Sequence, residues 1–224
     1  NELARLLGLP LASFRVIPPG IELPPFAPLQ AVGSDILHLS NGKPHKNIWG
    51  LIEAYASLPD SLQRQHPLVL AGIHHEWRRE TERAIAHFTP TGQVRLEGFV
   101  DESSLPVLYS SAAMFAFPSL VEGFGIPPLE AMAHGVPVVA STGGALPETL
   151  GDAAVLVNPR DVRALSDALA AVLTDRNLRI RLVQAGRQRA SLFSAERTGA
   201  ALAGVVTEVL HGITTPCALE EPCS

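Results

Sequence analysis

The stretch PSLVEGFGIPPLEAMAHGVPVVAS, residues 118–141, decides the fold that we predict for this chain. The apolar run MFAFPS at 114–119 leads into it and the run PVVAS at 137–141 closes it, and both are typical of strands buried on two faces. Between them, EGFGIPP at 122–128 places two glycines before two prolines. Proline suits the first turn of a helix, where its missing N–H would have no helical partner. We therefore predict a strand, a glycine loop, a helix that begins near Ile126, and a second strand.

The same alternation extends over most of the chain. Further short apolar runs are ILHL at 36–39, LVLAG at 68–72, VRLEG at 94–98 and AVLVN at 154–158. Helix-periodic stripes run from Ile48 to Tyr55, Trp77 to Phe88, Leu105 to Ala112, Val162 to Leu173 and Leu202 to Val209, with Asn47, Asp101 or Ser103, Asp161 and Ser194 as candidate N-caps. Parallel strands need crossovers, which helices supply. The pattern therefore predicts an α/β fold with a doubly wound, Rossmann-like parallel sheet of about six strands and helices on both faces.

Composition narrows the function classes. Of the 224 residues, 46% are hydrophobic and 17% are charged, which is enough apolar material for a sizeable core. A net charge of -5 argues against a nucleic-acid partner, which would need a concentrated basic face. No apolar stretch approaches the roughly 20 residues of a membrane-spanning helix. The two cysteines lie in the C-terminal tail, so we expect a cytoplasmic protein without a transmembrane segment or a disulfide framework.

We divide the chain into three segments. Residues 1–34 are rich in proline and glycine, and we interpret them as an inter-domain linker with at most a short helix near Glu2–Leu7. Residues 35–212 form the Rossmann-like domain with its C-terminal helices. Residues 213–224, which carry Cys217 and Cys223, form a flexible tail.

The glycine loop at 122–125 has the features of an anion site. The first N–H groups of the following helix have no helical partner, and the helix dipole favours negative charge there, most naturally a phosphate. Glu122 lies in the loop and Glu130 about one turn into the helix, and a carboxylate beside bound phosphate would be repelled. Each is better suited to accept hydrogen bonds from hydroxyls, and a ligand with hydroxyls on both sides of its phosphates is a nucleotide sugar. For either glutamate alone, the alternative is an ordinary solvated acid.

Two weaker segments support a phosphate ligand. LHLSNGKPHKN at 37–47 places basic residues, among them Lys46, just before a helix, where the dipole disfavours cations unless an anion compensates. LEGFVDESSL at 96–105 follows a strand and could hold a planar base, although a solvated turn explains either segment alone. The sequence has no P-loop, dinucleotide fingerprint, D-x-D or zinc spacing, and the trio HHE at 74–76 fits a polar turn. We therefore expect neither a metal ion nor another cofactor.

Several stretches resemble, in the same order, segments of one enzyme family. EGFGIPPLE at 122–130 resembles the E-x7-E motif of the retaining glycosyltransferases of family 4, also called group 1. Further similar stretches are VIPPGIE at 16–22, KPHKN at 43–47, GFVDE at 98–102 and LPETLGDAAVLVNPRD at 146–161. The chain resembles the C-terminal, donor-binding half of the family's two-domain, B-type architecture.

The resemblance implies a hexosyltransferase that binds a nucleotide-diphospho-sugar. The sugar would pass with retention to a hydroxyl of an acceptor glycan or lipid-linked sugar, in polysaccharide, glycan or glycolipid synthesis. An N-terminal domain would bind the acceptor, and without it we expect the chain to be inactive. Peripheral attachment of the full-length protein to the inner membrane is compatible with this function.

The resemblance also implies roles for particular residues. Lys46 would neutralise the diphosphate, Glu122 would bind the transferred sugar and Glu130 the ribose, so Glu122 and Lys46 are the catalytic candidates. The complete donor-binding set is Ser40, Gly42, Lys46, Phe99, Val100, Glu122, Gly123, Phe124, Gly125, Ile126, Pro127 and Glu130, with Phe99 and Val100 at the base.

One position departs from the family pattern. Many members carry arginine six residues before the basic-turn lysine, whereas this chain has Ser40. A subgroup of sugar-polymer mannosyltransferases often has a small hydroxyl residue there, which favours GDP-mannose as the donor. Two other functions remain open, a non-catalytic nucleotide-binding module and a sugar-nucleotide epimerase of the same architecture. A flavodoxin-like receiver would need an acidic cluster after the first strand, where this chain is basic.

Overall fold

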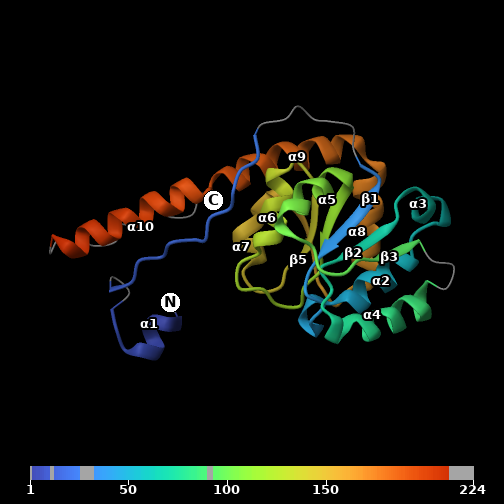
Figure 1. The fold of residues 1–224 in the computed structure, drawn as a ribbon, viewed down its shortest axis with the longest axis horizontal. Coiled ribbons are helices and arrows are strands. Elements are labelled where there is room, and N and C mark those ends of the chain that lie inside the picture. The colour runs from blue at the N-terminus through green and yellow to red at the C-terminus, as the bar shows by residue number, and fades with distance from the viewer. Residues whose placement is uncertain (1, 11–12, 26–32, 90–92, 212–224) are drawn as a thin grey trace. The chain divides into compact units, whose positions relative to one another are not determined.

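The computed structural model describes residues 2–10, 13–25, 33–89 and 93–211, and the chain divides into two compact units (Figure 1). The larger unit is Leu23–Leu192, and the smaller one combines Asn1–Glu22 with Phe193–Ser224. The C-terminal helix therefore groups with the N-terminal segment and not with the sheet. The three segment bounds inferred from the sequence remain a prediction, and the tail at 213–224 with its two cysteines lies outside the described residues.

The larger unit is built on a sheet of six parallel strands, which confirms the predicted fold class. The strands are β1 Asp35–Leu39, β2 Leu68–Ala71, β3 Val94–Leu96, β4 Ala112–Phe117, β5 Val138–Ser141 and β6 Ala154–Val157. Their order is β3-β2-β1-β4-β5-β6, so the chain builds outward from β1 and then returns to its other side with β4. Ala112 was predicted to end a helical stripe, but it begins β4 because its backbone pairs with Asp35 of β1.

Helices cover both faces of this sheet (Figure 1). The helices of the larger unit are α2 Ile48–Ala56, α3 Asp60–Gln65, α4 His75–Phe88, α5 Leu105–Ser111, α6 Ile126–Ala133, α7 Leu146–Leu150, α8 Val162–Thr174 and α9 Arg176–Ser191, with short 3-10 turns at Pro44–Lys46, Glu102–Ser104 and Gly151–Ala153. Crossovers between parallel strands are right-handed, and the direction of travel across the sheet reverses at β4. The crossover helices α2 and α6 therefore lie on opposite faces. Helices α4 and α8 pack with α2, and α9 packs with α6.

The apolar pattern did not predict helices α3, α7 and α9, and α9 is the longest of these three. It is rich in arginine and glutamine and buries only Leu182, Val183, Gly186 and Ala190. Small residues let it approach α6 closely, since a Cβ atom on Gly186 would lie 3.0 Å from Met132 Cγ. A helix that packs through small side chains carries a weak hydrophobic stripe, so sequence periodicity alone does not reveal it.

The core follows from the burial of the central strands. Every residue of β2, β4 and β5 is buried, whereas the edge strands β3 and β6 contain no buried residue. The largest side chains that are fully excluded from solvent include Tyr55, Tyr109, Phe115, Phe117, Leu51 and Leu129. Burying a large apolar side chain stabilises a fold by roughly 1.5–3 kcal/mol, so these central strands are rigid supports for the loops at their ends.

Two of the predicted helix caps, Asp161 and Ser194, are confirmed, and the predicted cap at Asp101 or Ser103 is not. The side chains of Asp161 and Ser194 accept hydrogen bonds from amides three residues along, as N-caps do. Asp101 precedes a 3-10 turn and makes no side-chain cap hydrogen bond. Ser103 lies inside that turn, and Ser104 occupies the cap position of α5, also without a side-chain bond. The 3-10 turn displaces the helix start, which the sequence pattern did not show.

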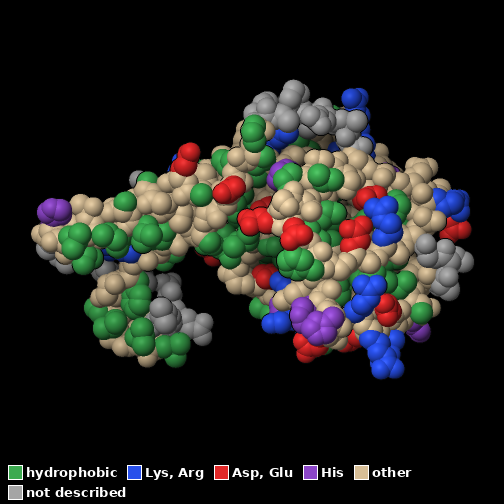
Figure 2. All heavy atoms as spheres, viewed as in Figure 1, with side chains coloured by type: hydrophobic (Ala, Val, Ile, Leu, Met, Phe, Trp, Pro, Cys, Tyr) green, Lys and Arg blue, Asp and Glu red, His purple; other side chains and the backbone are tan. Residues whose placement is uncertain are grey.

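In the smaller unit, helix α10 Ala195–Leu210 pairs at its start with the N-terminal segment, which contains α1 Glu2–Leu7. The amide of Ile21 donates to Phe193 O at 2.8 Å, and the amide of Ala195 donates to Ile21 O at 2.9 Å. The predicted helix is confirmed, but its apolar stripe at 202–209 is not buried in the described part of the chain. Figure 2 shows hydrophobic side chains exposed along α10, and Val209 is 74% exposed.

His38 in β1 is a fully buried polar residue in the larger unit. Its Nδ1 lies 2.8 Å from Ala116 O, which can only accept, so Nδ1 carries the proton. Nε2 then accepts from Ser40 Oγ at 2.8 Å. Burial lowers the pKa of His38 to about 4, with a smaller contribution from Lys46 in the same direction, while the Ala116 hydrogen bond and Glu122 oppose the shift.

We predict that His38 makes the larger unit sensitive to acid. Between pH 6.5 and about 4 the unfolded chain binds this proton and the folded chain does not, so the free energy of unfolding rises with pH over that window. The contribution is complete above pH 6.5, is lost as pH falls towards 4, and amounts to about 3 kcal/mol. Urea unfolding of His38→Asn from pH 4 to pH 7.5 should show a flatter pH dependence than the native chain. The exposed His75→Asn should keep the native slope, and an equal slope in the His38 variant would contradict the prediction.

Candidate functional site

The site predicted from the sequence lies between β1 and β4, where the strand order reverses. These two strands are neighbours, and Ile36 and Leu37 pair with Met114 and Phe115. Parallel strands end at the same edge, so the basic turn after β1 and the glycine loop after β4 lie beside each other. In open α/β sheets this switch point is where ligands bind.

The basic turn is tied to the glycine loop by hydrogen bonds. Asn47 occupies the N-cap position of α2, but its side chain does not cap the helix, which corrects the prediction. Its amide Nδ2 donates instead to Pro118 O at 3.1 Å and to Pro159 O at 2.8 Å. Asn47 has a φ of 56°, in the left-handed region that asparagine tolerates. The amide of Leu120 also donates to His45 O at 2.7 Å, so hydrogen bonds run in both directions between the two loops.

Lys46 and Glu122 form an ion pair across this junction. Lys46 Nζ lies 2.6 Å from Glu122 Oε1, and the two side chains are only 15% and 12% exposed. The same ammonium lies 5.2 Å from the centre of the Phe117 ring. The structure thus brings together the two predicted catalytic residues, although 76 positions separate them in the sequence.

The glycine loop and the start of α6 have the predicted form. Helix α6 begins at Ile126, with prolines in its first turn, which confirms the predicted start. Gly125 has a φ of 105°, a conformation that other residues rarely adopt. A Cβ atom on Gly123 would meet nothing within 4 Å, so open space lies beside the loop. Pro127 and Pro128 have no N–H and the amide of Leu129 donates to Gly125 O, so Ile126 is the residue of this first turn whose amide can face the space. Together with the positive end of the helix dipole, it is suited to an anion.

The loop after β5 supports this arrangement, and the sequence analysis did not single it out. The amide of Ala145 donates to Glu122 O at 3.0 Å. Gly144 has a φ of 65°, and a Cβ atom there would collide with the backbone of Glu122. Ser141 Oγ donates to Ser119 O, directly before the glycine loop. The sequence signal was the TGG tripeptide at 142–144 after a predicted strand, since paired glycines there indicate close backbone approach.

Glu130 is held by a buried tyrosine that the sequence analysis placed in no role. Tyr109 OH donates to Glu130 Oε2 at 2.9 Å, and the Tyr109 ring stacks on His134 with centroids 4.9 Å apart. Burial raises the pKa of Glu130; the Tyr109 hydrogen bond opposes this shift, and Glu102 adds to it. One carboxylate oxygen is therefore engaged with Tyr109, which leaves Oε1 available to a ligand hydroxyl.

The remaining predicted residues lie around the same edge of the sheet. Ser40 follows β1 and bonds to His38, and its Oγ also accepts from the amide of Gly42 at 3.3 Å. Gly42 has a φ of 85°. Phe99 and Val100 follow β3, at the other end of the β3-β2-β1 half of the sheet, and Phe99 is 88% exposed. The structure therefore brings Lys46, Glu122 and the glycine loop together. Within the described part of the chain, no hydrogen bond or ion pair joins Phe99 or Val100 to these residues.

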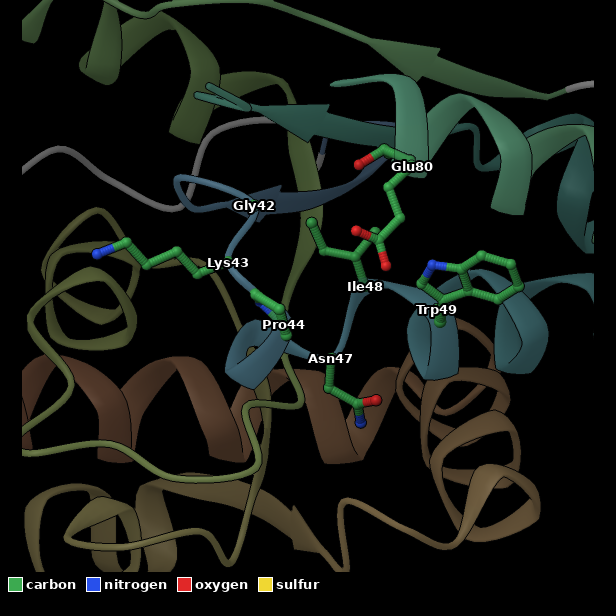
Figure 3. Close-up of a pocket in the computed structure, with 8 residues that line it drawn as sticks. Gly42, Lys43, Pro44, Asn47, Ile48, Trp49 and Glu80 are labelled. Atoms are coloured by element: carbon green, nitrogen blue, oxygen red, sulfur yellow. The ribbon is translucent and has the colours of Figure 1, made fainter. Parts of the chain in front are cut away.

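A separate shallow pocket lies between the basic turn and α4 (Figure 3). It is lined by Gly42, Lys43, Pro44, Asn47, Ile48, Trp49, Glu80 and Thr81. In Figure 3, Glu80 reaches from α4 towards Ile48 and Trp49, whereas Lys43 points away from them. Neither Lys46 nor Glu122 lines this pocket, so it is distinct from the ion pair between the loops.

Two further findings concern metals and membranes. His74 and His75 lie with their rings 4.1 Å apart at the start of α4, and Glu76 follows them. Over the described residues, no group of three or more His, Cys, Asp or Glu side chains is arranged to hold a metal ion. In the same part of the chain, none of the helices combines the length and apolar character needed to cross a membrane.

Comparisons with known proteins agree on one family. Residues 31–189 match the family described as glycosyl transferases group 1. The chain is 39% identical over 161 residues to O-antigen chain mannosyltransferase B of Escherichia coli, covering 71% of this chain and 42% of the relative. It is 30% identical over 201 residues to the GDP-mannose-dependent alpha-(1-6)-phosphatidylinositol monomannoside mannosyltransferase of Mycobacterium tuberculosis, covering 80% and 51%.

A solved structure extends the comparison to the fold. Sucrose-phosphate synthase from Thermosynechococcus elongatus matches with a TM-score of 0.78 and 30% identity, over 88% of this chain and 53% of that one. The chain thus spans about half the length of the relatives that it matches. Because the family match covers all six strands and both loops of the site, the chain belongs to the glycosyl transferases group 1 family.

Proposed function

We propose that this chain is the donor-binding half of a retaining group 1 glycosyltransferase, and that the site between β1 and β4 binds GDP-mannose. The observation that carries the proposal is the meeting of Lys46 with Glu122 beside the open glycine loop. A cation and the positive end of the α6 dipole suit a diphosphate, and a carboxylate suits the hydroxyls of the attached sugar. The mannosyltransferase relatives, one of them named as GDP-mannose-dependent, support mannose and guanine as the sugar and the base.

In the proposed reaction, the bond between the anomeric carbon of the sugar and a diphosphate oxygen breaks, and its electron pair stays on the diphosphate. The acceptor hydroxyl oxygen bonds to the anomeric carbon on the same face, and its proton passes to the leaving diphosphate. Lys46, the amide of Ile126 and the positive end of the α6 dipole would oppose the negative charge that develops there, which lowers the barrier. These groups supply positive charge, so the proposal includes no metal ion. An N-terminal domain outside this chain would bind the acceptor glycan or lipid-linked sugar.

Glu130 would accept a hydrogen bond from a ribose hydroxyl through its free oxygen. Its carboxylate lies about one turn into α6, beyond the loop that would hold the phosphates, and this position supports assigning it to the nucleoside side of the ligand. Tyr109 fixes the orientation of this carboxylate from within the core. In this proposal Tyr109 is therefore a positioning residue and Glu130 a ligand contact.

We predict that Lys46→Gln weakens GDP binding by about tenfold to a hundredfold, the range expected when a charge-assisted hydrogen bond is lost. Titration calorimetry of the 224-residue chain with GDP measures the effect. The control is Lys43→Gln, which removes the same charge from the same turn at an exposed side chain that lines the separate pocket beside α4. Equal affinities for the two variants, or no GDP binding by the native chain, would refute the proposed site.

A second prediction concerns the ribose contact. Tyr109→Phe should weaken GDP binding severalfold and leave the binding of a 2′,3′-dideoxy analogue of GDP unchanged, because only the ribose hydroxyls reach Glu130. The variant should also lose GDP affinity at a higher pH than the native chain, since the hydroxyl of Tyr109 holds down the pKa of Glu130.

The matched control for this test is Tyr55→Phe. Tyr55 is also buried, and its hydroxyl contacts the carbonyl oxygens of Gln63 and His66, away from the site. It should lose stability without a change in GDP affinity. Equal losses for GDP and its dideoxy analogue in Tyr109→Phe would exclude a role for this pair at the ribose.

A further inference from the structure

The two charged groups of the proposed site are already engaged with each other. Lys46 Nζ donates to Glu122 Oε1 at 2.6 Å, and both side chains are largely removed from solvent. His38 interacts electrostatically with both, but burial lowers its pKa to about 4, so it adds no charge to the pair at neutral pH. A diphosphate that approaches Lys46 must therefore compete with Glu122 for the same ammonium.

The cost of this competition depends on what else the ligand carries. A partly buried carboxylate that loses its cation is left with an uncompensated charge, and a nearby diphosphate repels it further. The carboxylate can only accept hydrogen bonds, so it needs donors in place of the ammonium. The hydroxyls of a sugar attached to the diphosphate are such donors, and hydrogen bonds to an ionised acceptor are strong. A nucleoside diphosphate without a sugar has no hydroxyl beyond its β-phosphate, and in the proposed site its ribose hydroxyls face Glu130 instead.

We infer that Glu122 is a specificity-determining residue that discriminates the nucleotide sugar from the sugar-free nucleoside diphosphate. This inference rests on the proposed function, and it adds a role for the ion pair. With donor bound, Lys46 turns to the diphosphate and the sugar hydroxyls take its place at Glu122. Once the sugar has left, Glu122 regains Lys46 and weakens the hold on the remaining diphosphate. The same carboxylate thus favours donor binding and product release.

The test is the variant Glu122→Gln, which keeps the size of the side chain and removes its charge. We expect GDP to bind roughly tenfold more tightly and GDP-mannose to bind more weakly, each measured by titration calorimetry on the 224-residue chain. Glu82→Gln is the charge-matched control, since Glu82 pairs with Arg78 on the exposed side of α4, and it should change neither affinity. If Glu122→Gln weakens GDP, or shifts both ligands equally, the inference is wrong.

A double-mutant cycle separates competition from simple positioning of Lys46. If Glu122 competes with the diphosphate, Lys46→Gln should reduce GDP affinity by a larger factor in the Glu122→Gln background than in the native chain. If Glu122 only orients Lys46, the factor becomes smaller, which overturns the inference. Glu122→Ala removes the carboxylate altogether and should also tighten GDP binding, so the conclusion does not rest on one variant's folding.

A native chain that binds neither GDP nor GDP-mannose would overturn the proposed function and this inference together. GDP binding that Glu122 does not oppose would overturn the inference alone.

Discussion

The pairing of β1 with β4 is the constraint on which the site depends. These strands are far apart in the sequence, yet they lie side by side because the chain completes β2 and β3 on one side of β1 before it returns to the other. The reversal brings two loops to one edge of the sheet, and both strands are anchored by buried residues. Lys46 from the first loop and Glu122 from the second meet at this edge.

Buried polar side chains hold the two loops in place, and the core would be less stable if any of them lacked a partner. Asn47 bonds to the carbonyl oxygens that follow β4 and β6, and Tyr109 bonds to Glu130. His38 links the backbone of β4 to Ser40 at the end of β1. A buried donor or acceptor without a partner costs about 1–3 kcal/mol, so each bond resists rearrangement. The loops that carry Lys46 and Glu122 therefore have rigid supports. In the proposed binding step, only these two side chains separate and take new partners on the ligand.

This exchange links the chemistry of the proposed reaction to its turnover. A site with an unpaired lysine would bind any diphosphate, including the product, and uniform binding of substrate and product slows release. Pairing the lysine with a carboxylate reduces the affinity for the diphosphate alone and ties tight binding to the presence of a sugar. The shared exclusion of Lys46 and Glu122 from solvent makes the exchange energetically significant, because solvent would otherwise screen the charges.

Several elements follow from the sequence by itself, because they depend on local chemistry. The apolar runs and stripes determine the alternation of strands and helices, and the prolines after Gly125 determine where α6 begins. Residue types at the strand ends point to an anion and hydroxyls as ligands. Other features were decided by the tertiary structure. Helix α9 packs through small residues, Asn47 bonds across two loops rather than capping α2, and Tyr109 and the loop at 142–145 reach the site from separate elements. Each of these depends on contacts between segments distant in the sequence, and periodicity and local propensity carry no information about which distant groups will meet.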